Sequence, residues 1–125
     1  MVVDCSVLSA VLFREDSSDE ALRILAGRTL HAPFLLDSEL ANVGVKKARA
    51  GMQEILIDDA LAKYGQHGIE LHHPDVREQF ALALRYGLSA HDAAYLWVAG
   101  FVQAPLATFD AKLAKAARAY LAGPG

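Results

Sequence analysis

The 125-residue sequence has one cysteine, four prolines and few aromatic residues, and it has no long apolar run. The single Cys5 cannot form an internal disulfide, which is typical of proteins from a reducing compartment and predicts a cytoplasmic location. The longest strongly apolar run, residues 93–102, is about half as long as a transmembrane helix requires. The N-terminus has no basic flank before an apolar stretch, so we expect neither a signal peptide nor a membrane span.

The sequence also lacks the excess of positive charge that is usual for nucleic-acid-binding proteins, because its formal net charge is −3. If four of its acids are gathered in one metal site, the rest of the chain carries a net charge of +1. The net charge therefore does not decide whether the partner is a nucleic acid. With 54% apolar and 22% charged residues the chain is not disordered. Its length predicts a single domain, residues 1–125.

Short apolar segments alternate with longer segments of helical periodicity. Strands are predicted at residues 2–3, 29–32, 68–71 and 105–108. Helices are predicted at residues 6–13, 35–50, 54–64, 90–100 and 110–121, and in the intervals Ser17 to Gly27 and Asp75 to Gly87. This alternation predicts an α/β fold of three layers, α/β/α, with a small parallel sheet of about four strands flanked by helices.

Four acids are predicted to lie at one edge of this sheet. Asp4 and Asp110 each follow a short strand and open a helix, while Glu39 and Asp92 lie early in their helices. In parallel α/β sheets the carboxyl ends of the strands form the ligand-binding edge. Four crowded carboxylates would repel one another, and a divalent cation removes that conflict. Ligands that are all oxygens favour Mg²⁺ or Mn²⁺.

A structural interpretation of each acid stays open beside the functional one. Asp4 and Asp110 are acceptable helix N-caps, and Asp92 completes a capping box that begins at Ser89. Glu39 is an acid near the positive end of a helix. Ser6 is itself a favoured N-cap residue. Spacing alone does not decide between these interpretations and a metal site.

Four motifs in this order resemble those of PIN-domain ribonucleases, and more narrowly of the VapC toxins of toxin–antitoxin pairs. The resemblance covers nearly the whole chain. The motifs are Val2-Val3-Asp4-Cys5-Ser6-Val7-Leu8, Ser38-Glu39-Leu40-Ala41-Asn42, Leu88-Ser89-Ala90-His91-Asp92-Ala93-Ala94-Tyr95 and Leu106-Ala107-Thr108-Phe109-Asp110-Ala111-Lys112-Leu113.

The resemblance implies a PIN-like fold and a Mg²⁺-dependent endoribonuclease, with Mn²⁺ as a substitute, that acts as the toxin of a type II toxin–antitoxin system. In such a site a metal-activated water cleaves the RNA phosphodiester, so no nucleophilic side chain is needed. The implied catalytic residues are Asp4, Glu39, Asp92 and Asp110. Of these, Asp4, Asp92 and Asp110 are the implied metal ligands, whereas Glu39 is expected to act through a water molecule. The residues expected to orient the carboxylates are Ser6, Asn42 and Thr108.

The resemblance also implies an RNA substrate, a VapB-type antitoxin, a homodimer and a larger complex with the antitoxin. The basic residues best placed to contact RNA phosphates are Lys46, Lys47, Arg49 and Lys112, although a solvated helix face is the better explanation for any one of them. The main alternative function is a non-catalytic PIN-like module for RNA binding or scaffolding. A phosphatase of the haloacid dehalogenase type is disfavoured because it needs a second acid where Ser6 stands.

His72, His73 and Asp75 are close together in sequence but are not interpreted as a metal site. Consecutive side chains on a strand point to opposite faces, so the two imidazoles are expected to diverge.

Overall fold

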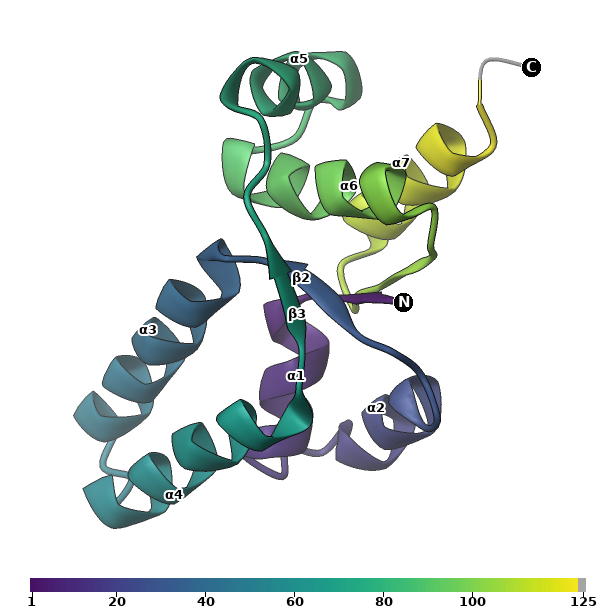
Figure 1. The fold of residues 1–125 in the computed structure, drawn as a ribbon. Coiled ribbons are helices and arrows are strands. Elements are labelled where there is room, and N and C mark those ends of the chain that lie inside the picture. Colours follow the sequence, from purple (N-terminus) through teal and green to yellow (C-terminus); the bar gives the residue numbers. More distant parts are fainter. Residues whose placement is uncertain (124–125) are drawn as a thin grey trace.

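The computed structural model describes residues 1–123, and its centre is a four-stranded parallel sheet between two layers of helices (Figure 1). The strand order is β3-β2-β1-β4, and each neighbouring pair is parallel. The strands are β1 (Val2–Val3), β2 (His31–Pro33), β3 (Glu70–His72) and β4 (Leu106–Ala107). The prediction of a three-layer α/β/α fold with about four parallel strands is confirmed.

Four helices cover one face of the sheet and three cover the other (Figure 1). The first layer contains α1 (Cys5–Leu12), α2 (Ser18–Leu25), α3 (Leu35–Arg49) and α4 (Glu54–Tyr64). The second contains α5 (Val76–Tyr86), α6 (Ala90–Val102) and α7 (Ala111–Leu121), and a short 3₁₀ turn, Gly65–His67, leads into β3. None of the helices in the described part of the chain has the length and apolar character to cross a membrane.

The core lies on both faces of the sheet because helices cover both of them. Val2 and Val3 of β1 are fully buried, one facing each layer of helices by the alternation of a strand. They belong to one buried cluster with Leu8 of α1, Leu36 of α3 and Val98 of α6. Burial on both faces explains why the strands read as continuous apolar segments and not as alternating ones.

Several helix ends differ from the prediction by one or two residues, and two of these differences have a clear physical reason. Helix α1 begins at Cys5 with Asp4 as its N-cap, so Ser6 lies inside the first turn and is not the cap. Helix α6 continues past Gly100 to Val102 and ends where Gln103 adopts a left-handed conformation. Gly100 is not a stop signal: a Cβ atom there would lie 2.5 Å from the ring of Tyr120, so its small size lets α7 approach.

Strands β2 and β3 begin two residues later than predicted. Pro33, predicted to terminate β2, is instead its last residue and pairs in register with His72. A proline is tolerated at such a position because it need not donate a ladder hydrogen bond there.

Helix α5 presents an exposed apolar stripe to the surface. Val76, Phe80 and Leu84 follow one another at four-residue intervals and are 78%, 63% and 69% exposed. The buried residues of α5 are Leu82 and Ala83, which face α6. The pattern identified the helix correctly but not which of its faces is covered.

Candidate active site

A buried carboxylate lies at the carboxyl end of β1. Asp4 caps α1, with its Oδ1 accepting a hydrogen bond from the backbone N–H of Val7 at 3.2 Å. Its side chain is otherwise shielded, and the residue is only 7% exposed. A buried charge needs compensating partners, and here two hydroxyl groups supply them. Ser6 Oγ donates to Oδ1 at 2.7 Å, and Thr108 Oγ1 donates to Oδ2.

The two hydroxyl groups also connect the starts of α1 and α7. Ser6 Oγ accepts a hydrogen bond from the backbone N–H of Phe109 at 3.1 Å, and Thr108 Oγ1 accepts one from the N–H of Asp110 at 3.0 Å. Asp110 in turn caps α7 by accepting from the N–H groups of Lys112 and Leu113. Since β1 and β4 are adjacent and parallel, these residues meet at one edge although about 100 residues separate them.

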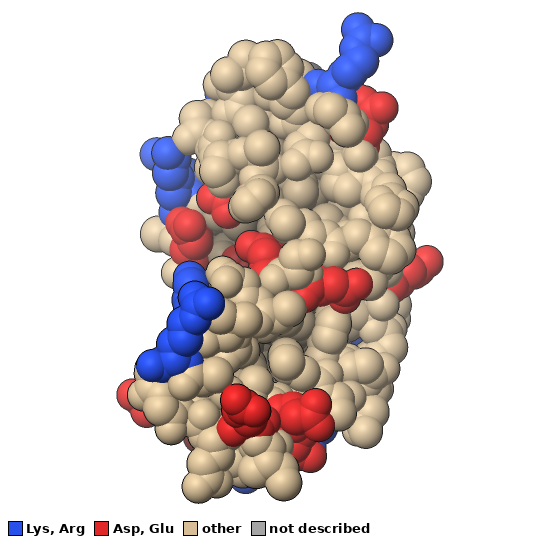
Figure 2. Space-filling model, turned by 90° about the vertical axis from the view of Figure 1, so that its left-hand side faces the viewer, with Lys and Arg blue, Asp and Glu red and all other residues tan. Residues whose placement is uncertain are grey.

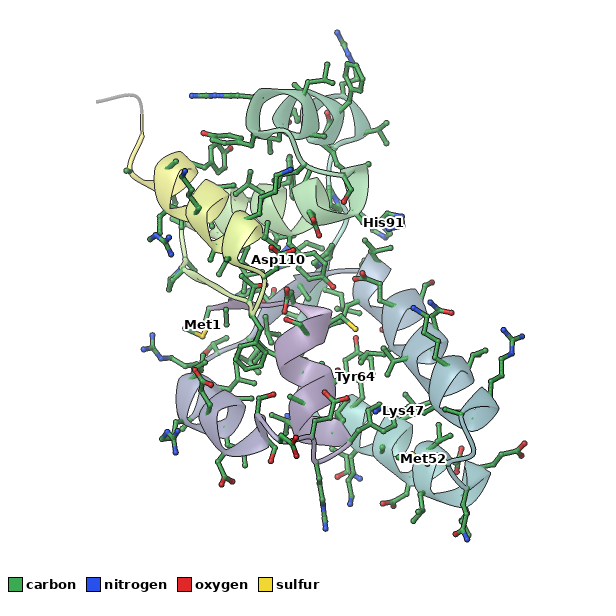
Figure 3. The ribbon with its side chains drawn as sticks, turned by 180° about the vertical axis from the view of Figure 1, so that it is seen from behind. Met1, Lys47, Met52, Tyr64, His91 and Asp110 are labelled. Atoms are coloured by element: carbon green, nitrogen blue, oxygen red, sulfur yellow. The ribbon has the colours of Figure 1, made fainter. Side chains whose placement is uncertain are left out.

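Asp92 and Glu39 approach the same edge from α6 and α3. Figure 3 shows His91, the neighbour of Asp92, and Asp110 at helix starts on the same side of the molecule. Burial raises the pKa of Asp92, and the negative charges of Asp110 and Asp4 raise it further. Burial likewise raises the pKa of Glu39, with Asp4 and Asp92 adding to the effect. The four acids therefore repel one another.

Glu39 has one firm partner within this group. The buried Tyr95 hydroxyl donates to Glu39 Oε1 at 2.5 Å, and this bond partly offsets the rise in the pKa of Glu39. The nearby thiol is unsuited to nucleophilic attack, because burial, together with Glu39 and Asp4, raises the pKa of Cys5 to about 12. A thiol with that pKa stays protonated at neutral pH.

The donor set of this acidic pocket, defined here as Asp4, Glu39, Asp92 and Asp110, fits a hard divalent cation. All its ligands are carboxylate oxygens, and their mutual repulsion is what a cation would relieve. No three of these carboxylates in the described chain bring ligand oxygens within 4.8 Å of one another. In Figure 2 acidic side chains form a band across the face at this edge.

The other residues expected at the site differ in their placement. Asn42 lies one turn after Glu39 on α3, is exposed, and makes no side-chain hydrogen bond to the described residues. Its expected role as an orienting residue therefore stays a prediction. Ser6 and Thr108, in contrast, both donate to Asp4.

The four basic candidates are not equivalent. Lys46 is exposed two helical turns after Glu39, and thus on its face of α3. Lys47 is bound to Glu15, with Nζ 2.9 Å from Oε2, and lies 5.0 Å from the centre of the Phe13 ring. Figure 3 shows Lys47 farther along α3, away from Asp110. Arg49 is exposed at the far end of α3, whereas Lys112 is exposed in the first turn of α7 beside the pocket.

Repulsion in the acidic pocket predicts that Asp92→Asn stabilises the metal-free protein. A carboxyl whose pKa is raised on folding binds protons more tightly in the folded state, so it lowers stability as pH rises through the folded pKa. The melting temperature of metal-free Asp92→Asn protein should exceed that of the wild type at pH 7.5, and the difference should shrink toward pH 4. Thermal melts in a chelating buffer measure this. A variant that is less stable at pH 7.5 would contradict the prediction.

Comparison with known proteins gives a consistent family assignment. The PIN domain family model matches residues 1–119. Ribonuclease VapC3 of Pyrobaculum aerophilum is 29% identical over an alignment of 121 residues that covers 92% of this chain and 92% of the relative. The crystal structure of PAE2754 from the same organism superposes with a TM-score of 0.74 at 24% identity, covering 97% of this chain and 91% of the other. The family-model match over nearly the whole chain shows that this protein belongs to the PIN domain family.

Proposed function

We propose that the protein is a Mg²⁺-dependent endoribonuclease, the toxin of a type II toxin–antitoxin system. The observation that carries this proposal is the buried Asp4 carboxylate, which two hydroxyls orient and whose negative charge adds to the rise in the pKa of Glu39 and of Asp92 that burial causes. The similarity to Ribonuclease VapC3 over 92% of the chain supports the assignment to RNA.

The residues of the acidic pocket have separate tasks in this proposal. Asp4, Asp92 and Asp110 would hold the cation, for which Mn²⁺ is expected to substitute. When bound, the cation supplies charge that polarises the phosphodiester and favours ionisation of the attacking water. Glu39 uses Oε1 to accept from Tyr95, which leaves Oε2 to accept a hydrogen bond from the attacking water. Ser6 and Thr108 keep the Asp4 carboxylate in one orientation.

Phosphate binding is proposed to fall mainly to Lys46 and Lys112. Both side chains are exposed, and each lies on a helix that also carries an acid of the pocket. Lys47 would first have to give up its ion pair with Glu15, and Arg49 lies about 15 Å along α3 from Glu39. RNA contact by these two residues stays part of the proposal, but we expect it to contribute less.

The proposed partners are a VapB-type antitoxin and a second copy of the chain. For the antitoxin we propose the apolar surface of α3 and α4, where Val45, Ile55 and Leu56 are exposed and Val45 lines a groove between the two helices. The α5 stripe offers a second apolar surface, which we propose for a homodimer that joins the antitoxin in a larger complex. Light scattering of the protein alone tests for the homodimer, and light scattering of its mixture with the product of the neighbouring gene tests for the complex with the antitoxin. A cytoplasmic location stays a prediction.

RNA cleavage by the purified chain tests the proposed function. With Mg²⁺ or Mn²⁺ we expect discrete products that carry a 5′-phosphate and a 3′-hydroxyl. Excess chelator should stop the reaction, and added Mg²⁺ should restore it. RNA binding without cleavage, together with melting temperatures unchanged by either ion, would instead support a non-catalytic binding or scaffold module.

A further inference from the structure

A second group of potential metal ligands lies on β2 and β3, separate from the acidic pocket. His31 pairs in register with Glu70, and His72 lies two residues farther along β3. Residues at such positions share one face of a parallel sheet. The His31 Nδ1 atom is 3.0 Å from His72 Nε2 and 3.4 Å from Glu70 Oε2. One ligand atom from each of the three side chains lies within 4.8 Å of the other two.

We propose that His31, Glu70 and His72 form a binding site for a transition-metal ion of the Zn²⁺ type. Two imidazoles and one carboxylate are a ligand set that Zn²⁺ uses in proteins, and Co²⁺ and Ni²⁺ accept it as well. In a tetrahedral zinc site with bonds of about 2.0–2.2 Å, the ligand atoms are about 3.3–3.6 Å apart. The 3.4 Å separation lies within that range, and the 3.0 Å separation lies just below it. A fourth position is left for water.

The surroundings also suit a bound ion. The partly buried His31 and His72 are held by backbone pairing in the sheet, so little rearrangement is needed to bring their nitrogens together. Phe101 of α6 packs edge-on against the His72 ring with centroids 5.8 Å apart, and Trp97 stacks on Phe101. This aromatic wall shields one side of the cluster. Glu70 is exposed on β3, an edge strand, which leaves an entry route from solvent.

Two simpler explanations exist for the same contacts. A hydrogen bond between two neutral imidazoles accounts for the 3.0 Å contact, and an ion pair of protonated His31 with Glu70 accounts for the 3.4 Å contact. Neither involves all three side chains at once. His73, the neighbour of His72, points elsewhere and stacks on Phe34, so it provides a matched control.

The proposed zinc-type site does not depend on the proposed nuclease function. Its ligands include two nitrogens, whereas the acidic pocket is made of oxygens alone and favours Mg²⁺. Its expected effect is structural, because one ion would tie the edge strand β3 to β2. Binding can therefore be measured in protein that carries Asp4→Asn and Asp92→Asn, in which the acidic pocket is disabled.

Titration of the metal-stripped full chain with Co²⁺ and Zn²⁺ tests the proposal in that background. We expect one equivalent of Co²⁺ to give visible absorption of low-symmetry N/O coordination, and Zn²⁺ to displace it and raise the melting temperature. His31→Gln and His72→Gln should each weaken binding at least about tenfold, since loss of even an outer partner costs 10–100-fold. His73→Gln should bind as the parent does.

The Glu70→Gln variant separates loss of metal binding from misfolding. The Glu70 side chain is exposed, so its replacement should leave the fold intact. It should weaken Zn²⁺ binding while its circular dichroism spectrum stays unchanged. No stoichiometric binding by the parent, or equal affinity in the parent and His72→Gln, would overturn the proposal.

Discussion

Asp4→Asn is expected to lower the rate of RNA cleavage about a thousandfold while the protein remains folded. The substitution keeps the size of the side chain and its ability to accept from Ser6 and Val7, but it removes the charge at the centre of the acidic pocket. If cation binding supplies about 4 kcal/mol of transition-state stabilisation, its loss corresponds to about three orders of magnitude in rate. Single-turnover cleavage of labelled RNA measures the effect.

The matched control for this experiment is Asp19→Asn. Asp19 is an exposed acid in the first turn of α2, a helix outside the acidic pocket. Its replacement changes net charge by the same amount but should leave cleavage within about twofold, as is usual for surface sites. Equal rates for Asp4→Asn and wild type, in preparations free of other nucleases, would refute the role of the acidic pocket.

Thr108→Val is expected to reduce cleavage by about 10–100-fold and to destabilise the protein by about 1–3 kcal/mol. The valine keeps the shape of the threonine but cannot donate to Asp4 Oδ2 or accept from the N–H of Asp110. Asp4 would then lose one of its two hydroxyl partners in a buried position. Urea denaturation and cleavage rates measured on the same preparations give both quantities.

The Thr108→Ser variant separates the role of the hydroxyl in orienting Asp4 from the role of the methyl group in packing. Serine retains the hydroxyl and lacks only a methyl group, so it should recover most of the cleavage rate lost in the valine variant. The valine variant should also need a different Mg²⁺ concentration for half-maximal rate, and serine should restore the wild-type value. A purely structural defect would not change this concentration. If serine and valine were equally impaired, the hydroxyl would have no part in orienting Asp4.

The signals that predict the acidic pocket are local in the sequence. A strand followed by an acid predicts a carboxylate at the ligand-binding edge, and the strands that precede Asp4 and Asp110, β1 and β4, are indeed adjacent and parallel. The hydroxyl partners of Asp4 were harder to assign. Ser6 and Thr108 have equally good local explanations as cap and turn residues, and only the pairing of β1 with β4 brings them to one carboxylate.

The features that escaped prediction depend on pairs of distant residues. His72 was considered only with its sequence neighbours, but its partner His31 lies on the adjacent strand, 41 positions earlier. The helix predicted at residues 90–100 continues to Val102, and the close contact of Gly100 with Tyr120 of α7 is invisible in the sequence. The basic cluster on α3 likewise gave no sign that Lys47 is paired with Glu15. Periodicity identifies an apolar face but does not say what covers it, as α5 shows.

The link between Asp4 and Thr108 has a consequence for the timing of protein synthesis. One side of the pocket is made within the first few residues, but the hydroxyl that completes the partners of Asp4 is added about 100 residues later. At about 5–20 residues per second, a nascent chain remains without it for several seconds. Until β4 has left the ribosome and docked beside β1, the pocket lacks Thr108 and Asp110. If the protein cleaves RNA, the ribosome that makes it is thus protected from its product until β4 has been made and has docked beside β1.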